Sequence, residues 1–218
     1  NLPNAMSVLA VSKKDNLLHA PDTYMEKIAV GKNIKEGVID LDFGITKNLK
    51  NLADFKNTTP DKLTICLLER ERHDHIVKDA KQLGTKIKFI SDGDVAGAIY
   101  AGIEEFKVDI YLGVGGAPEG VLAAAAIKCL GGQFQARLVL SNDHEIDKAK
   151  KMGIKDLKKK YYINDIVKDD VLFCATGVTG GDLLQGIEIL DNGFYQSETY
   201  VLHHASKLNK KIINKFKI

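Results

Sequence analysis

A glycine-rich segment at residues 113–120, with the sequence GVGGAPEG, bears most directly on chemistry. The apolar run before it, at 109–112, predicts a buried strand, and the alanine-rich run after it predicts a helix. A strand that ends on glycines and continues into a helix is typical of an anion site. The glycines admit close backbone approach, and the first helical N–H groups have no internal partners. Pro118 suits the first helical turn, where its missing N–H does no harm.

Glu119 stands at the start of this predicted helix, where a carboxylate would repel a bound phosphate. The residue fits an anion site if a metal ion lies between the two negative groups, which makes it a candidate metal ligand. Alternatively, Glu119 only complements the positive end of the helix dipole. This segment leaves both interpretations open.

Three other polar clusters follow predicted strands. They are ERERHD at 69–74, SDGD at 91–94 and TGVTGGD at 176–182. Arg70 and Arg72 can clamp a phosphate through paired N–H groups. Asp92 and Asp94 suit sugar hydroxyls or a divalent cation. Taken singly, a charged run is typical of a solvated helix start and a DGD sequence of a turn. Four such clusters at one sheet edge would instead favour a site for a phosphorylated polyol.

The elements that must position these clusters alternate along the chain. Strands are predicted at 6–12, 62–68, 86–90, 109–113, 135–140 and 170–177, and helices at 45–57, 73–84, 95–106 and 120–132. This order predicts an α/β fold with a largely parallel sheet covered by helices on both faces. Ligands of such sheets bind at the carboxyl ends of the strands. The four polar clusters therefore lie where a site is expected.

Composition and missing motifs narrow the class of protein. The 31 basic and 29 acidic residues leave a net charge of +2, so we expect no nucleic-acid partner. No apolar run approaches 18 residues, so we expect no membrane association. Three isolated cysteines without CxxC spacing indicate reduced thiols in the cytoplasm. The chain contains no nucleotide-binding P-loop, complete dinucleotide fingerprint or Gly-x-Ser-x-Gly elbow.

Five separated blocks agree with one known family in sequence, order and spacing. They are APDTYMEK (20–27), RERHD (70–74), DGDVAGAI (92–99), GVGGAPEGVLAAAAIKCLGG (113–132) and ATGVTGGDLLQGI (175–187). These blocks resemble the signature segments of the bacterial class II fructose-1,6-bisphosphatases. The resemblance runs over nearly the whole chain.

The resemblance implies a metal-dependent phosphatase of the lithium-sensitive sugar and inositol phosphatase superfamily. Its layered fold would be α/β/α/β/α, with this chain forming mostly the C-terminal parallel-sheet portion. The implied reaction removes the 1-phosphate of fructose 1,6-bisphosphate in gluconeogenesis, with Mn²⁺ or Mg²⁺ as cofactor. Carried over by position, the implied substrate contacts are Tyr24, Arg70, Glu71, Arg72, Asp92, Gly93, Asp94 and Gly116. Glu119 would be a metal ligand.

Relatives carry a long region before the NAMSVLAV segment, with further acidic metal ligands and a threonine that orients the attacking water. We therefore expect the catalytic residues upstream of Asn1. Residues 1–58 would be strands and a helix of an incomplete N-terminal lobe, and 59–218 an α/β substrate-binding lobe. Because two hard cations need several carboxylates, we expect residues 1–218 alone to bind the sugar bisphosphate weakly without hydrolysing it.

Two other functions stay open. The substrate can be sedoheptulose 1,7-bisphosphate, or the protein can accept both sugars. In a different class, the chain can be a non-catalytic sugar-phosphate binding module, although such a module would have no need of Glu119. We also expect a homo-oligomer, paired through an exposed strand edge within residues 185–202.

Overall fold

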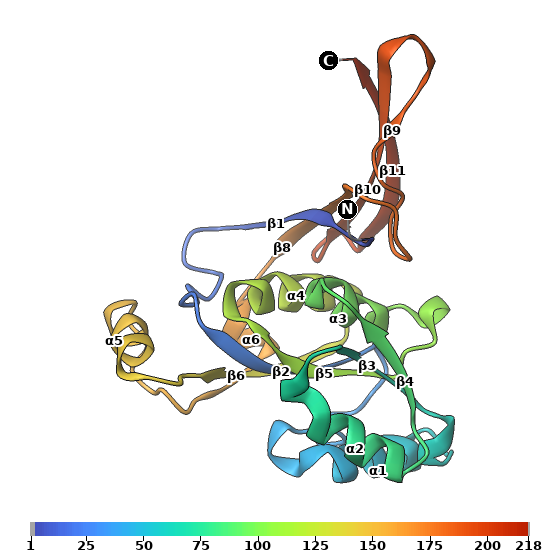
Figure 1. Cartoon of the computed structure of the whole chain (residues 1–218). Helices are drawn as coiled ribbons and strands as arrows, with labels where there is room; N and C mark the ends of the chain where they lie inside the picture. The colour runs from blue at the N-terminus through green and yellow to red at the C-terminus, as the bar shows by residue number, and fades with distance from the viewer. Residues whose placement is uncertain (1–2, 218) are drawn as a thin grey trace.

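The computed structural model describes residues 3–217, which form two β-sheets with helices between them (Figure 1). The strands of the larger sheet are β2 (Tyr24–Val30), β3 (Thr64–Leu68), β4 (Lys86–Ile90), β5 (Ile110–Gly116), β6 (Gln133–Val139) and β7 (Lys160–Tyr162). They lie side by side in the order β4-β3-β5-β2-β6-β7. β3 is parallel to β4 and β5, whereas β2 is antiparallel to both β5 and β6.

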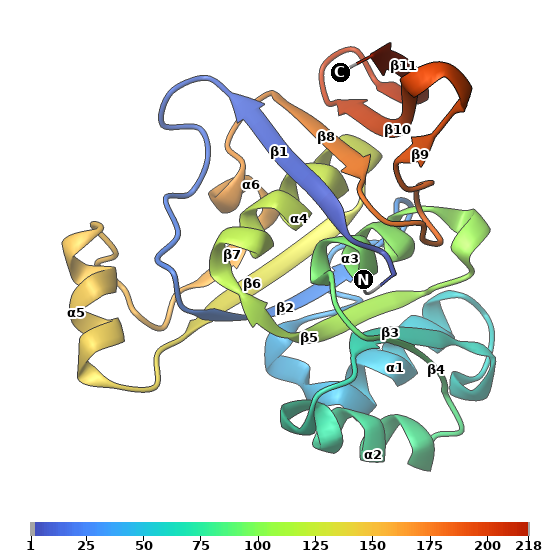
Figure 2. The same cartoon turned by 45° about the horizontal axis from the view of Figure 1, so that its top comes forward.

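The second sheet is antiparallel throughout the described residues. Its strands are β1 (Met6–Ser12), β8 (Val171–Gly177), β9 (Glu188–Ile189), β10 (Phe194–His203) and β11 (Leu208–Lys217). Figure 2 shows β1 and β8 side by side, and β10 pairs with β8, β9 and β11. The first and last parts of the chain therefore meet in this sheet.

Helices form two of the layers. The α-helices are α1 (Gly44–Phe55), α2 (Asp74–Gln82), α3 (Asp94–Gly102), α4 (Ala117–Leu130), α5 (Asp143–Lys151) and α6 (Ile163–Ile166), with short 3-10 turns η1 (Leu41–Phe43), η2 (Pro60–Lys62), η3 (Glu71–His73), η4 (Glu104–Phe106) and η5 (Asp191–Gly193). α3 and α4 lie between the two sheets, and α1 and α2 cover the opposite face of the larger sheet (Figure 1). Four layers thus follow in the order helix, sheet, helix, sheet.

Burial explains why α3 and α4 have so few polar residues. Every residue of α3 from Asp94 to Ala101 is buried, as is the alanine run at 123–126 in α4. A helix that is apolar all round must be covered on both sides, which the two sheets provide. α1 and α2 instead bury one face each, with Leu49 and Ile76 in a second apolar cluster beneath β2, β3 and β5.

The predicted α/β class is confirmed, but the prediction of a largely parallel sheet is wrong. Only the β4-β3-β5 part is parallel. β2, which precedes these strands in the chain, is inserted antiparallel between β5 and β6, and the strand predicted at 170–177 belongs to the second sheet. Alternating strands and helices favour parallel pairing locally, but they do not determine where an earlier strand inserts.

The predicted boundary after residue 58 falls between α1 and η2. Strands from both sides of it share each sheet, because β1 pairs with β8, and β2 pairs with β5 and β6. The division into two lobes stays a prediction. Within residues 3–217 the longest helix, α4, has 14 residues, and none has the length and hydropathy needed to span a bilayer.

Candidate active site

Three of the four predicted clusters meet at the carboxyl edge of β3, β4 and β5. One hollow of about 190 Å³ lies there. It is lined by Tyr24, Leu68, Arg70, Arg72, Asp92, Asp94, Gly115, Gly116 and Glu119. Tyr24 comes from the neighbouring antiparallel strand β2, where it pairs in register with Gly116. Six of the eight predicted substrate residues and the predicted metal ligand thus border one space, whereas Glu71 and Gly93 do not line it.

The fourth cluster, at 176–182, does not share this edge, so that part of the prediction is wrong. It begins with the last two residues of β8, which lies in the second sheet. Its loop still approaches the site. The backbone N–H of Asn4 donates to the Gly180 carbonyl at 3.1 Å. Lys88, in strand β4, forms an ion pair with Asp182 at 2.7 Å. A second hollow of about 250 Å³ beside Asn4 is bordered by Asp92, Gly93 and Glu119.

The turn η3 fixes the glycine loop through both backbone groups of Val114. The Arg72 Nε donates to the Val114 carbonyl at 2.9 Å, and the Val114 N–H donates to His73 Nε2 at 2.8 Å. His73 Nδ1 lies 2.8 Å from the Leu68 carbonyl, so the ring carries its hydrogen on Nδ1 and is neutral. The Arg72 guanidinium also lies 5.0 Å from the centre of the Tyr24 ring. Arg72 therefore reaches the hollow from a fixed position.

His73 makes the stability of this clamp pH-dependent. Burial, with a smaller contribution from the Arg72 charge, holds the pKa of His73 below its ordinary value. Below about pH 6.5 the unfolded chain takes up a proton at this residue and the folded protein resists it. The free energy of unfolding should therefore decrease as the pH is lowered below about 6.5, by at most about 1.4 kcal/mol per pH unit. Urea unfolding at about pH 7.5 and about pH 5.5 measures this.

The matched variants for that measurement are His73→Gln and His75→Gln. His75 is exposed on α2, so its replacement is the control that keeps the His73 contacts to Leu68 and Val114. His73→Gln should be less stable at both pH values, because it loses the hydrogen bond from the Val114 N–H. Its free energy of unfolding should also depend less on pH, because the imidazole is gone. A His73→Gln variant with the full wild-type pH dependence would contradict this account.

The two predicted aspartates have different surroundings. Asp92 is exposed, and its Oδ1 accepts the Gly93 N–H at 2.9 Å. Gly93 adopts the left-handed region with φ of 78°, which suits the glycine before the first turn of α3. Asp94 is 3% exposed and pairs with Lys27, while its Oδ1 has no hydrogen-bond partner among the described residues. Asp92 thus faces solvent at the site, and Asp94 forms its floor.

Glu119 lies at the first turn of α4, where its Oε2 accepts the Gly116 N–H at 3.2 Å. Burial, and then the negative charges of Asp94 and Asp92, raise the pKa of Glu119, with Lys27 acting in the opposite sense. A divalent cation would neutralise this concentration of carboxylates, and hard oxygen donors suit Mg²⁺ and Mn²⁺. Within the described residues no group of three or more His, Cys, Asp or Glu forms a complete set of ligands. Glu119 thus offers one oxygen donor of the kind that such a cation binds, and its role as a metal ligand stays a prediction.

The glycines of the 113–120 loop have a structural reason that the sequence did not reveal. A Cβ at position 115 would collide with the Asp94 carboxylate and lie 3.2 Å from Lys27 Nζ. A Cβ at position 120 would lie 2.7 Å from the Met25 sulfur. These glycines leave room for the buried Lys27–Asp94 pair, in addition to shaping the turn.

Lys27 and His73 are two polar residues beside the site to which the sequence analysis assigned no role. A signal for Lys27 was present, since it occupies the same face of its strand as Met25 and Ala29, where a charged residue is out of place. For His73 the sequence held no comparable signal, because a histidine in a charged run is ordinary.

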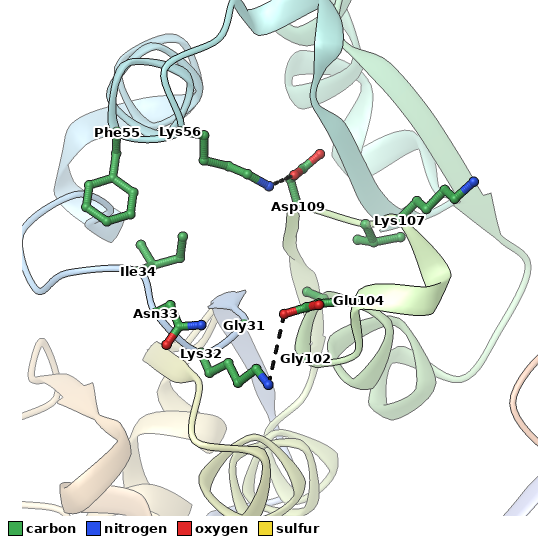
Figure 3. Close-up of a pocket in the computed structure, with 12 residues that line it drawn as sticks. Gly31, Lys32, Asn33, Ile34, Phe55, Lys56, Gly102, Glu104, Lys107 and Asp109 are labelled. Atoms are coloured by element: carbon green, nitrogen blue, oxygen red, sulfur yellow. Dashed lines mark hydrogen bonds and ion pairs between the residues drawn. The ribbon is translucent and has the colours of Figure 1, made fainter.

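Another cavity, of about 440 Å³, lies at the opposite ends of β2, α3 and β5 and contains none of the predicted residues (Figure 3). Its lysines Lys56 and Lys32 bind Asp109 and Glu104, respectively, the second pair at 4.0 Å (Figure 3). Because the two sets of lining residues have no member in common, the site assigned from sequence and this cavity are separate features.

Comparison with known proteins identifies the family. Residues 1–216 match the sequence profile described as bacterial fructose-1,6-bisphosphatase, glpX-encoded. The chain belongs to this family. The residues matched by the glpX-type bisphosphatase profile include all of those that line the hollow.

Curated members of the family align over most of the chain. Fructose-1,6-bisphosphatase class 2 of Haemophilus influenzae is 41% identical over 223 residues, which cover 96% of this chain and 66% of that protein. Fructose-1,6-bisphosphatase 1 class 2 of Escherichia coli K12 is 38% identical, with the same coverage. The D-fructose 1,6-bisphosphatase class 2/sedoheptulose 1,7-bisphosphatase of Synechococcus sp. strain JA-3-3Ab is 36% identical over 93% of this chain and 62% of its own length. The chain thus spans 62–66% of the length of these relatives.

Proposed function

We propose that the protein containing this chain hydrolyses the 1-phosphate of fructose 1,6-bisphosphate to fructose 6-phosphate and phosphate, a step of gluconeogenesis. The observation that carries the proposal is the gathering of residues from four separate segments around one hollow. The two arginines there suit the phosphate group of a sugar phosphate, and the three carboxylates suit its hydroxyl groups or a cation. Membership of the glpX-type family supports the same reaction.

The arginines are the residues we assign to phosphate binding. Arg70 is exposed and donates through one guanidinium nitrogen to the Glu69 carbonyl at 2.8 Å, which leaves its other N–H groups for a ligand. Arg72 is held against Val114 and faces Tyr24. We assign Tyr24 to the sugar or phosphate wall of the hollow and Asp92 to hydroxyl groups, which donate hydrogen bonds to carboxylates.

The remaining assignments complete the site. Glu71, Gly93, Asp94 and Gly116 stay predicted substrate contacts, with Gly93 bordering the adjacent hollow. We propose Glu119 as a ligand of Mn²⁺ or Mg²⁺, and the metal when bound would supply activation of water and neutralisation of phosphate charge. Other metal ligands and the residue that orients water are proposed to lie outside this chain. The three free cysteines support a reducing, cytoplasmic location, and a homo-oligomer stays a proposal.

Replacing Arg70 tests the assignment of phosphate binding. In the intact gene product, Arg70→Ala should raise the KM for fructose 1,6-bisphosphate by about 10- to 100-fold, because a charge-assisted hydrogen bond to phosphate contributes about 1.5–3 kcal/mol. Phosphate release, measured with and without Mn²⁺ over a range of substrate concentrations, gives KM and kcat separately. Lys107→Ala removes a positive charge at the far end of β5 and should leave KM unchanged.

The outcomes of that assay separate the candidate functions. Comparable release from sedoheptulose 1,7-bisphosphate would favour a dual enzyme, an alternative supported by the name of the Synechococcus relative. Binding of either sugar bisphosphate without phosphate release would favour a non-catalytic binding module. An Arg70→Ala variant with wild-type KM would remove Arg70 from the proposed phosphate site.

A further inference from the structure

A completely buried ammonium group lies directly beneath the candidate active site. Lys27 of β2 forms an ion pair with Asp94, the first residue of α3, and the two side chains are 0% and 2% exposed. The same ammonium donates a second hydrogen bond to the Gly116 carbonyl at 2.8 Å. Gly116 is the residue from which α4 starts. One side chain therefore joins a strand and the beginnings of two helices.

Stability alone does not explain this arrangement. Burying two charges requires removing both from water, and apolar residues of similar volume often replace such a pair with no loss of stability. Lys27 also occupies the face of β2 that otherwise buries Met25 and Ala29 in the main core. The Asp94 Oδ1 still lacks a partner among the described residues, so even this pair leaves one carboxylate oxygen unsatisfied. What the pair does provide is a fixed distance between α3 and α4.

The contacts continue from Lys27 to Glu119. The Gly116 carbonyl accepts from Lys27, and the N–H of the same residue donates to Glu119 Oε2 at 3.2 Å. Because both backbone groups of Gly116 are hydrogen-bonded, they constrain the backbone at the start of α4 and the carboxylate of Glu119. On the other side, Asp94 is two residues from Asp92 and borders the same hollow.

We propose that Lys27 is a positioning residue of the active site, which holds Glu119 and the first turn of α4 at a fixed place relative to the Asp92–Asp94 turn. The inference rests on the proposed function for its catalytic consequence. Lys27 itself is buried, so it acts through its contacts with Asp94 and Gly116. Its effect would reach a bound cation through Gly116 and Glu119, as supporting residues around a metal site commonly act.

Lys27→Met in the intact gene product tests the proposal, since methionine keeps much of the volume and removes the ammonium. Amide hydrogen exchange at residues 116–121 should become at least about 10-fold faster, because the Gly116 carbonyl loses its partner. The Mn²⁺ concentration for half-maximal phosphate release should rise by about 10- to 100-fold, the effect typical of losing a supporting contact. The KM for fructose 1,6-bisphosphate should change less than this.

Two controls separate positioning from general loss of stability. Lys128→Met removes another buried ammonium from α4, one that binds Asn164 and the Val167 carbonyl away from the site. This variant should keep the wild-type Mn²⁺ dependence and the wild-type exchange at 116–121. If Lys27→Met does not fold, the double variant Lys27→Met/Asp94→Asn takes its place, because it leaves no unpaired buried charge. Asp94→Asn alone then measures the contribution of the carboxylate.

Each result decides between the alternatives. Wild-type exchange and Mn²⁺ dependence in the Lys27 variant would overturn the proposal. Equal changes in Lys128→Met would also overturn it, because they would assign the effect to stability. If the wild-type protein releases no phosphate, the proposed function fails, while the exchange comparison still decides whether Lys27 fixes the first turn of α4.

Discussion

Replacing Glu119 with alanine in the intact gene product should reduce Mn²⁺-dependent phosphate release from fructose 1,6-bisphosphate by at least about 100-fold. A divalent cation in a phosphatase activates water and neutralises charge, so the loss of one of its carboxylate ligands removes more than a single hydrogen bond would. The carboxylate is well placed for this role, because it borders the same hollow as Asp92 and Asp94. Initial rates over a range of Mn²⁺ concentrations measure the effect.

Glu119→Gln distinguishes the metal ligand from a helix cap. Glutamine keeps an oxygen that accepts the Gly116 N–H, but it has no negative charge to hold a cation. A metal ligand predicts that Glu119→Gln is nearly as inactive as Glu119→Ala, whereas a cap predicts wild-type release. Glu105→Gln, an exposed carboxylate on η4, should leave release unchanged. Full activity of both Glu119 variants would contradict a metal-ligand role and would leave Glu119 as a residue that only complements the helix dipole.

Gly115→Ala should lower the free energy of unfolding by about 3 kcal/mol. The added methyl group would collide with the Asp94 carboxylate and lie 3.2 Å from Lys27 Nζ, both of which are buried and already paired. Overpacking in a core typically costs about 1–3 kcal/mol, and disturbing a buried ion pair adds to that loss. Urea unfolding of wild type and variant at one pH gives the difference.

The matched control is Gly180→Ala. A Cβ there has no heavy atom nearer than 4.0 Å, and the residue is not among the glycines with positive φ. Its stability should stay within about 0.5 kcal/mol of wild type, as is usual for a surface substitution. Equal stabilities of the two alanine variants would show that the Lys27–Asp94 pair moves aside easily, which would also weaken the positioning role of Lys27.

Local sequence patterns were enough to predict the individual elements and most residues of the candidate site. Strands at 6–12 and 86–90 lie where they were predicted, and the helix predicted at 45–57 corresponds to α1. Apolar periodicity and terminating glycines are local signals, so they identify an element without reference to the rest of the chain. The polar residues after β3, β4 and β5 were predicted to meet because parallel strands end at one edge, and they do.

Which strands are neighbours, and which residues lie beneath the site, became known from the three-dimensional packing. Periodicity identifies strands but not their partners, so it could not place β2 between β5 and β6 or β8 in the second sheet. The Lys27–Asp94 pair depends on that insertion, because only a strand beside β5 brings Lys27 under Gly115 and Gly116. His73 likewise acquires its role from the distant Val114. Contacts between residues 41 to 89 positions apart arise from packing, which local sequence patterns do not encode.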